Sequence, residues 1–351
     1  MRALAGRVLT VGVPGAQLDG ATRRALIALA PGGVVLFRRN VETVAQLRRL
    51  VAALHALPSR PRVAIDHEGG RVQRLVAPFT HFPAAADVGR AGVAAARAVG
   101  QAMGRELSAI GIDNNSAPVL DVPRAGGSDA IGERGFAAEP HRAAALAVAF
   151  LRGLQRGGVL PCGKHFPGHG AATADSHLTL PVVRRSRRAL ARTEMAPFRA
   201  AIAAGVPLLM TAHVRYPALD ARRCATLSPA ILGDLLRSAL GFRGIVVSDD
   251  LAMRAISDHR DVPNAAQAAL AAGVDWLLVC HDLATAQRAA DRLVAAALRC
   301  TRFATRLRDA ATRVAALPAR SATRPALRLP VAAHAALADR IAAVAAAARA
   351  C

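Results

Sequence analysis

The stretch LLMTAHVRYPALDARRCATLSPAILGDLLRSALGFRGIVVSD, residues 208–249, contains one complete strand–helix–strand unit. Its ends, Leu208–Val214 and Gly244–Asp249, are short apolar runs of the kind found in strands that are buried on both faces. Between them, Pro229–Leu240 has apolar residues at helical spacing, and the Ser-Pro pair where it begins is typical of a helix start. The stretch therefore predicts two parallel strands joined by a helix.

The same alternation continues through most of the chain. Six further strand candidates are Val8–Val13, Gly33–Phe37, Arg62–Asp66, Ile112–Asp121, Val159–His165 and Trp276–Cys280. The other predicted helices are Val41–Leu57, Val93–Ile110, His141–Arg156, Arg187–Ala204 and Asn264–Ala272. Gly205 and Gly273 follow two of these helices, where a left-handed cap is common. Eight strand–helix units favour an α/β fold, a closed (β/α)8 barrel of the TIM type, over an open sheet.

The C-terminal part of the sequence indicates helices and no second catalytic domain. After Cys280 the chain is rich in alanine and arginine, and a Pro/Ser/Arg interval at Leu317–Pro330 precedes a last helix at Val331–Ala350. We therefore predict a single catalytic barrel over residues 1–316. Residues 317–351 are predicted to be a linker and a helix packed on that barrel.

The high positive charge first suggests a polyanion as partner. The formal net charge is +22, but 45 of the 46 basic residues are arginines scattered along helix-like segments. Aromatic residues amount to 3% of the chain and do not alternate with basic ones, as they would in a surface that stacks bases. We therefore interpret the charge as a solvated basic surface and expect no nucleic-acid partner. A basic nucleic-acid-binding protein remains an alternative.

The cysteine pattern and the shortness of the apolar runs indicate the cell compartment in which the protein works. The five cysteines form no CxxC pair, which fits free thiols in a reducing environment. The apolar run at Val8–Val13 is shorter than a secretory signal requires, and no uninterrupted apolar stretch has the length of a membrane span. We expect a cytoplasmic monomer that needs neither a membrane nor a cofactor and acts on a small molecule.

Chemically active residues gather where the predicted strands end. They are Asp66, Asp121, Lys164, His165, His213, Asp249 and Asp250. In a (β/α)8 barrel the C-terminal ends of the strands form the active site, and buried parallel strands otherwise avoid charges. Asp66 with Arg71 and Arg74 offers groups that can bind sugar hydroxyls, whereas Arg134 is ambiguous on its own. The pattern predicts one polar active site at this rim.

The segment Gly163–His177 carries the most distinctive chemistry. It contains Lys164, the only lysine of the chain, and its glycines and proline predict a mobile loop. Asp175 and His177 are two residues apart, so in an extended loop the carboxylate can hold one imidazole nitrogen. This contact raises the pKa of the histidine and suits it to proton transfer near neutral pH. An Asp–His pair that only stabilises the loop is the other interpretation.

A zinc site is an alternative for this segment. Its ligands would come from Cys162, His165, His169, Asp175 and His177. Their spacing matches no standard zinc motif, and a flexible loop would hold ligands poorly. We therefore expect no metal.

Adjacent carboxylates end the strand Gly244–Asp249. Neighbouring strand residues point to opposite faces, so only one of Asp249 and Asp250 can face a pocket inside the barrel. A carboxylate at such a position can serve as a glycosidic nucleophile, an electrostatic stabiliser or a metal ligand.

Three stretches resemble a known family. They are Ile65–Arg74, Lys164–Gly170 with Asp175-Ser176-His177, and Ser248–Met253. They are similar in order and spacing to the NagZ-type β-N-acetylhexosaminidases of glycoside hydrolase family 3, over most of the chain. In the run Ile112–Ser116 the chain departs from the family, since similar proteins usually carry a more apolar run there.

The resemblance implies a role for each matching residue. It makes Asp249 the nucleophile, His177 the acid/base and Asp175 its partner. The residues that grip N-acetylglucosamine (GlcNAc) would be Asp66, Arg74, Arg134, Lys164 and His165. The implied activity is retaining exo-hydrolysis that releases GlcNAc from GlcNAc-1,6-anhydroMurNAc peptides in cytoplasmic peptidoglycan recycling.

Two other functions stay open at this point. A neutral histidine repels an anionic nucleophile less than a glutamate would, so a β-GlcNAc phosphorylase that uses phosphate in place of water is the nearest alternative. A non-catalytic sugar-binding barrel is the second. Binding alone does not need both Asp249 and the Asp175–His177 pair.

Overall fold

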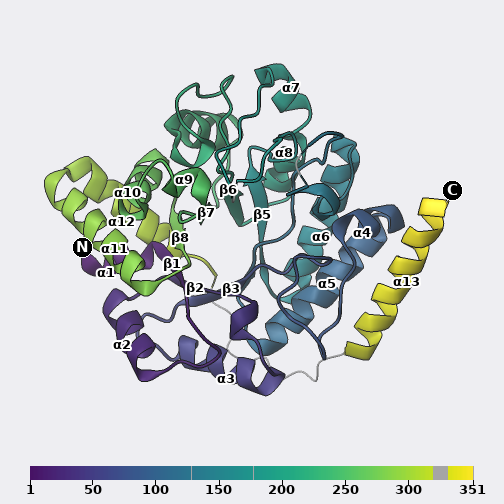
Figure 1. Ribbon diagram of the computed structural model, residues 1–351, viewed down its shortest axis with the longest axis horizontal. Coiled ribbons are helices and arrows are strands. Elements are labelled where there is room, and N and C mark those ends of the chain that lie inside the picture. The colour runs from purple at the N-terminus through teal and green to yellow at the C-terminus, as the bar shows by residue number, and fades with distance from the viewer. Residues whose placement is uncertain (128, 177, 319–330, 351) are drawn as a thin grey trace.

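Eight parallel strands close into a barrel in sequence order (Figure 1). The computed structural model describes residues 1–127, 129–176, 178–318 and 331–350. The strands are β1 (Leu9–Gly12), β2 (Gly33–Leu36), β3 (Arg62–Ile65), β4 (Asn114–Asn115), β5 (Leu160–Phe166), β6 (Leu208–Thr211), β7 (Ile245–Asp250) and β8 (Trp276–Val279). Each strand pairs with the next, and β1 pairs with β8. The predicted TIM-type barrel is confirmed.

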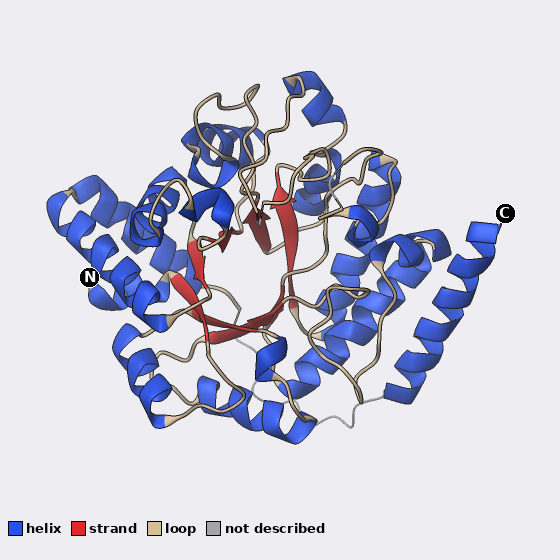
Figure 2. Ribbon diagram, viewed as in Figure 1, coloured by secondary structure: helices blue, strands red, loops and turns tan. Residues whose placement is uncertain are grey.

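Helices surround the barrel on the outside (Figure 2). The α-helices are α1 (Arg2–Arg7), α2 (Gly20–Leu29), α3 (Val44–His55), α4 (Ala85–Ala91), α5 (Val93–Ile110), α6 (Pro140–Gly157), α7 (Arg187–Arg192), α8 (Ala196–Ala203), α9 (Arg254–Ser257), α10 (Val262–Ala272), α11 (Leu283–Arg299), α12 (Thr301–Ala315) and α13 (Val331–Ala350). Three 3₁₀ turns, η1 (Arg38–Asn40), η2 (Gly132–Arg134) and η3 (Ala225–Leu227), and a π-helix, η4 (Ala230–Ala239), complete the set.

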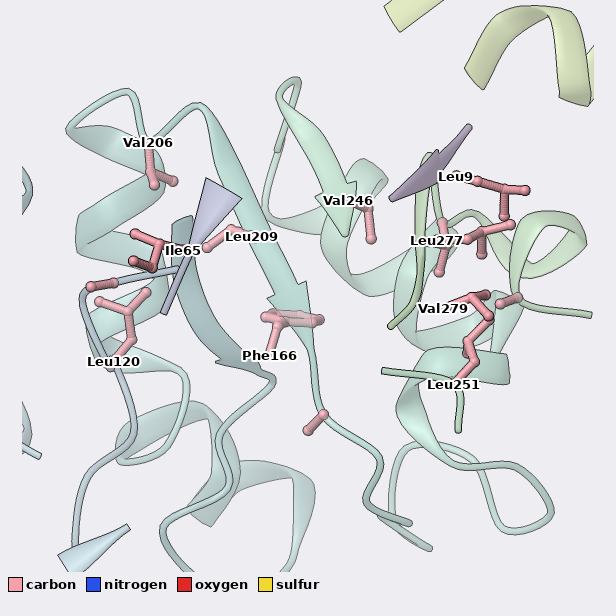
Figure 3. Packing of buried hydrophobic residues seen from close by; sticks show 14 of the residues in the cluster. Leu9, Ile65, Leu120, Phe166, Val206, Leu209, Val246, Leu251, Leu277 and Val279 are labelled. Atoms are coloured by element: carbon pink, nitrogen blue, oxygen red, sulfur yellow. The ribbon is translucent and has the colours of Figure 1, made fainter. Parts of the chain in front are cut away.

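The apolar side chains of the strands pack into two hydrophobic cores, one inside the barrel and one between the strands and the helices. Along β6, Leu208 and Met210 face the interior of the barrel, whereas Leu209 between them packs outward against the helices. In β7, Val246 likewise faces outward (Figure 3). Because both faces of every strand are buried, nearly every strand position must be apolar. The continuous runs in the sequence follow from this requirement.

Small residues let two helices of the outer layer approach closely. A Cβ atom added to Gly157 of α6 would lie 2.6 Å from the Cα of Gly104 in α5, and one added to Gly100 would lie 2.3 Å from the carbonyl oxygen of Phe150. Backbone therefore packs against backbone at this interface. A chain with few aromatic residues can fill its outer core in this way.

The fourth strand is shorter than predicted. The strand covers Asn114 and Asn115, and the amide of Ala117 then donates to the carbonyl of Asn115 at 2.8 Å. Beyond this turn the segment meets β5 again, where Val119 and Lys164 form an isolated parallel bridge. The Asn115 side chain binds the backbone of His67, accepting from its amide at 2.9 Å and donating to its carbonyl at 2.7 Å. The polar residues in this run thus join β4 to the segment that follows β3.

The predicted helix Arg187–Ala204 is instead two helices, α7 and α8. The break falls at Thr193–Met195, where the carboxylate of Glu194 is fully buried and pairs with Arg124 at 3.0 Å. The hydroxyl of Thr193 donates to the carbonyl of Ala189 at 2.7 Å. The buried Glu194 carboxylate and its ion pair with Arg124 thus lie at the break between the two helices.

The last helix, α13, packs beside α4 and α5 (Figure 1). His334 on its buried side lies 2.8 Å from a carboxylate oxygen of Glu106, which also accepts from the hydroxyl of Thr80 at 2.5 Å. By length and composition Val331–Arg349 could also cross a membrane, although Asp339 and Arg340 interrupt it. Most of the predicted linker at Leu317–Pro330 lies outside the described residues.

Candidate active site

A buried ionic cluster joins the loops that follow β3 and β4 to β5. The Lys164 ammonium lies 2.9 Å from Asp66 and 2.7 Å from Glu68. Arg134 donates to both oxygens of Glu68, at 2.8 and 2.9 Å. Each of these cations therefore has a carboxylate partner, as buried charges require.

These contacts keep the cluster ionised. Burial opposes the charged form of Glu68, but Lys164 and Arg134 outweigh it and hold the pKa of Glu68 far below its usual value. Burial likewise works against the charge of Lys164, yet Asp66 and Glu68 raise the pKa of its ammonium. The result is a rigid set of hydrogen-bonding groups around Asp66, at the C-terminal end of β3.

Replacing Glu68 with glutamine tests the role of this cluster. Glu68→Gln leaves two buried cations sharing fewer carboxylate charges, so we expect the free energy of unfolding to fall by about 3 kcal/mol. The Michaelis constant for a β-GlcNAc glycoside should also rise, because Lys164 and Arg134 lose their fixed positions. Urea unfolding and steady-state kinetics measure the two effects. Glu133→Gln, at an exposed position next to Arg134, is the control; equal stability of both variants would contradict the assignment.

The loop after β3 carries two arginines, Arg71 and Arg74, which have different partners. Arg74 approaches the second oxygen of Asp66 at 3.9 Å, and its backbone amide donates to the ring of His67 at 3.2 Å. Burial lowers the pKa of His67 to about 3, so the ring is neutral and can accept this bond. The guanidinium of Arg71 instead donates to backbone carbonyls of the β4 loop, including that of Ala130 at 3.2 Å. Arg71 thus ties two loops together.

A second cluster centres on Asp121, just beyond β4. One of its oxygens lies 2.6 Å from the Nδ1 of His165, and the other accepts from the backbone amides of His165 and His169 at 3.1 and 2.7 Å. Burial disfavours ionisation of Asp121, but the two histidine side chains and the amide of His169 lower its pKa. The carboxylate fixes the His165 ring so that its Nε2 is directed away from Asp121.

Asp249 lies near the end of β7, where positively charged or ionisable side chains from β5 and from the loop after β6 act on it electrostatically. Burial opposes its ionisation, but His165, His213 and Lys164 and the amide of Asp250 together lower its pKa. This residue is therefore a carboxylate at neutral pH. It has the state that a nucleophile requires.

Asp250 lies in a different environment from its neighbour. Its carboxylate accepts from the amides of Ala252 at 3.1 Å and Cys280 at 3.3 Å, and burial raises its pKa. The carbonyl of Asp250 lies 3.0 Å from the Nε2 of His213. His213 thus holds the backbone directly after Asp249.

The loop after β5 carries the predicted proton donor. In the described part, Ser176 lies 3.2 Å from the Nε2 of His169, and the carbonyl of Asp175 accepts from the amides of Leu178 and Thr179 at 3.0 and 3.1 Å. His177 lies outside the described residues. Its role as acid/base, with Asp175 as partner, stays a prediction.

Four of the five residues of the zinc alternative lie in the described part of the chain, and His177 lies outside it. Among the described residues, no group of three or more histidine, cysteine, aspartate or glutamate side chains is placed to hold a metal ion. Cys162 is instead a buried thiol inside the barrel, and burial raises its pKa to about 12. His165 uses its Nδ1 for Asp121.

The sequence showed several supporting residues without revealing their roles. Glu68 and Asp121 lie inside or beside recognised motifs, but each acts on residues far along the chain, such as Lys164 and His165. Asn115 belongs to the run that departs from the family pattern, and it holds the backbone of His67. The signal available was a polar residue within or close to the end of a predicted strand.

Comparisons with known proteins agree with this geometry. Residues 6–317 match the model of the glycosyl hydrolase family 3 N-terminal domain. A β-hexosaminidase of Thioalkalivibrio sulfidiphilus is 43% identical over 287 residues, which cover 80% of this chain and 82% of that protein. One from Neisseria meningitidis serogroup C is 41% identical over 274 residues, 76% of this chain and 75% of its own.

Solved structures give the same result. A family 3 β-N-acetylglucosaminidase from Paenibacillus has a TM-score of 0.90 and 35% identity, covering 98% of this chain and 68% of that chain. NagZ from Neisseria gonorrhoeae, in complex with N-trifluoroacetyl-D-glucosamine, has a TM-score of 0.75 and 34% identity, covering 88% of this chain and 98% of its own.

Proposed function

Because the chain belongs to glycoside hydrolase family 3, as a β-N-acetylhexosaminidase, we propose that it removes terminal GlcNAc from GlcNAc-1,6-anhydroMurNAc peptides. The substrate would be a product of peptidoglycan breakdown, and the enzyme would act as a cytoplasmic monomer in its recycling. The observation that carries this proposal is the ionised Asp249 beside the cluster of Asp66, Glu68 and Lys164.

The cluster suits a sugar at the non-reducing end. Asp66 can accept hydrogen bonds from hydroxyl groups, and Lys164, Arg74 and Arg134 can donate them. The oxygens of Asp66 face two of these cations, so an acceptor and donors lie side by side. His165, held by Asp121, supplies a further donor on the side of Asp249. A solved relative with an N-acylated glucosamine bound supports this choice of sugar.

The proposed reaction has two steps. Asp249 attacks the anomeric carbon while His177 gives a proton to the leaving oxygen, which forms a covalent glycosyl–Asp intermediate. His177 then takes a proton from water, and that water releases the sugar with its configuration retained. Most retaining glycosidases use two carboxylates. Here the Asp175–His177 pair would replace the second one.

The loop that carries Asp175 and His177 would move during the cycle. Leaving group and water must exchange between the two steps, and loop opening is the usual means of exchange in enzymes that exclude water during chemistry. Ser176 connects this loop to His169, whose backbone amide is bound to Asp121. Ser176 is thereby tied, through His169, to the same carboxylate that orients His165.

Phosphorolysis is the second candidate, because the proposed acid/base is a histidine and not a carboxylate. The test is hydrolysis of a chromogenic β-GlcNAc glycoside with and without inorganic phosphate. We expect free GlcNAc at a rate that phosphate does not change. Appearance of GlcNAc 1-phosphate in proportion to added phosphate would favour the phosphorylase. Failure to release GlcNAc from a GlcNAc-anhydroMurNAc peptide would contradict the proposed substrate.

A further inference from the structure

The guanidinium of Arg39 is fixed at the mouth of the barrel. Its Nε donates to the carbonyl of Val13, directly after β1, at 3.1 Å, and its Nη2 donates to the carbonyl of Cys280, directly after β8, at 3.4 Å. Its Cζ also lies 4.6 Å from the ring centre of Phe37, directly after β2. Three strands therefore hold this cation at the same rim that carries Asp249.

Arg39 differs from the other cations of the rim in its partners. Lys164, Arg134 and Arg74 each face a carboxylate of the cluster. Arg39 is exposed, and among the residues that the structure describes no carboxylate lies within ion-pair distance of it. Only two of the five guanidinium N–H groups bind the carbonyls named above. Its charge therefore remains available to an anion.

The proposed position of the sugar gives a direction for the leaving group. The proposed sugar-binding side chains come from the ends of β3 and β5 and from the loop after β4, and Asp249 comes from β7. A sugar held by the first set, with its anomeric carbon at Asp249, directs the aglycone away from β3 and β5. That direction leads to β8 and β1, which lie across the barrel from β5 (Figure 1).

Cys280 connects the reaction centre to Arg39. Its backbone amide donates to the carboxylate of Asp250 at 3.3 Å, and Asp250 directly follows Asp249 in β7. Its carbonyl is the one that Arg39 binds. Cys280 thus separates Arg39 from Asp250 and Asp249, and Arg39 lies on the proposed aglycone side of these two acids.

We propose that Arg39, stacked on Phe37, binds a carboxylate carried by the aglycone and makes the enzyme prefer anionic leaving groups. A guanidinium presents paired N–H donors that match a carboxylate, and stacking on an aromatic ring keeps its plane fixed. The proposal rests on the proposed function, because it needs a GlcNAc ring between Asp66 and Asp249. It adds a specificity determinant outside the sugar pocket.

The test compares substrates that differ only in this charge. One pair is the free acid and the methyl ester of GlcNAc-anhydroMurNAc, and the second is 4-carboxyphenyl β-GlcNAc and its methyl ester. For Arg39→Gln we expect kcat/KM to fall about 10- to 100-fold on the acid of at least one pair, mainly through KM, the usual effect of losing one hydrogen bond to a charged group. On the esters the loss should stay below about threefold.

Two controls separate charge from structure. Arg38→Gln removes the neighbouring exposed arginine, whose guanidinium donates to the carbonyl of Val41, and should change acid and ester equally. Preserved activity of Arg39→Gln on the esters shows that the variant is folded. Equal losses on the acid and the ester of both pairs would overturn the proposal. If the wild type cleaves only the aryl glycosides, the proposed substrate fails, and the aryl pair still decides the role of Arg39.

Discussion

Asp249→Ala is expected to lower the turnover of a β-GlcNAc glycoside by at least about 10⁴-fold while the barrel stays folded. Without the carboxylate no glycosyl–enzyme bond can form at this position. The nearby carboxylates of Asp66, Glu68 and Asp121 are already paired with Lys164 or His165. Its pKa is already lowered in the folded protein, so the wild type holds the reactive form at neutral pH. Steady-state rates on a chromogenic substrate and a thermal unfolding curve measure the two halves of this prediction.

Asp250→Asn is the matched control. An asparagine oxygen can still accept from the amides of Ala252 and Cys280, and the raised pKa of Asp250 means that its charge is already disfavoured. This variant should therefore lose far less activity than Asp249→Ala. Azide added to Asp249→Ala should enter the vacated space and yield the α-glycosyl azide, visible by NMR. Full activity of Asp249→Ala would end the assignment of the nucleophile.

His177→Ala is expected to lower the rate by about 10²–10⁴-fold on substrates whose leaving group must be protonated, the usual contribution of a positioned acid/base. On an aryl glycoside with a very acidic phenol, formation of the intermediate needs no proton, so its loss should be smaller. Measuring kcat/KM over a series of phenols with different pKa values gives the comparison. Asp175→Asn should show a weaker version of the same trend, with a shifted pH profile. An equal loss across the series would argue against the acid role.

The fold could be predicted because both faces of each strand are buried. Runs such as Leu208–Val214 must then be apolar throughout, and helical periods separate them. The errors lie where polar side chains govern the backbone. β4 ends at Asn115, whose side chain binds the backbone of His67. The helix predicted after the β5 loop is divided at Glu194, whose buried carboxylate pairs with Arg124.

The sequence allowed us to predict which residues form the site, but not which of them contact one another. Asp66, Lys164 and Asp249 follow apolar strands, so their convergence at one rim follows from the barrel. The bridge made by Glu68 was not predictable, because it joins Lys164 and Arg134, which come from other loops. Sequence spacing within one motif carries no information on such distant partners.

The bridge at Glu68 has a consequence for how the enzyme responds to its medium. The charges that would grip the sugar are buried and compensate one another, and dissolved ions screen such pairs weakly. The sugar itself is neutral. Binding of an uncharged GlcNAc glycoside should therefore be nearly independent of ionic strength, even though the chain carries a formal charge of +22. The dissociation constant of such a glycoside should be nearly the same at low and at high salt concentration.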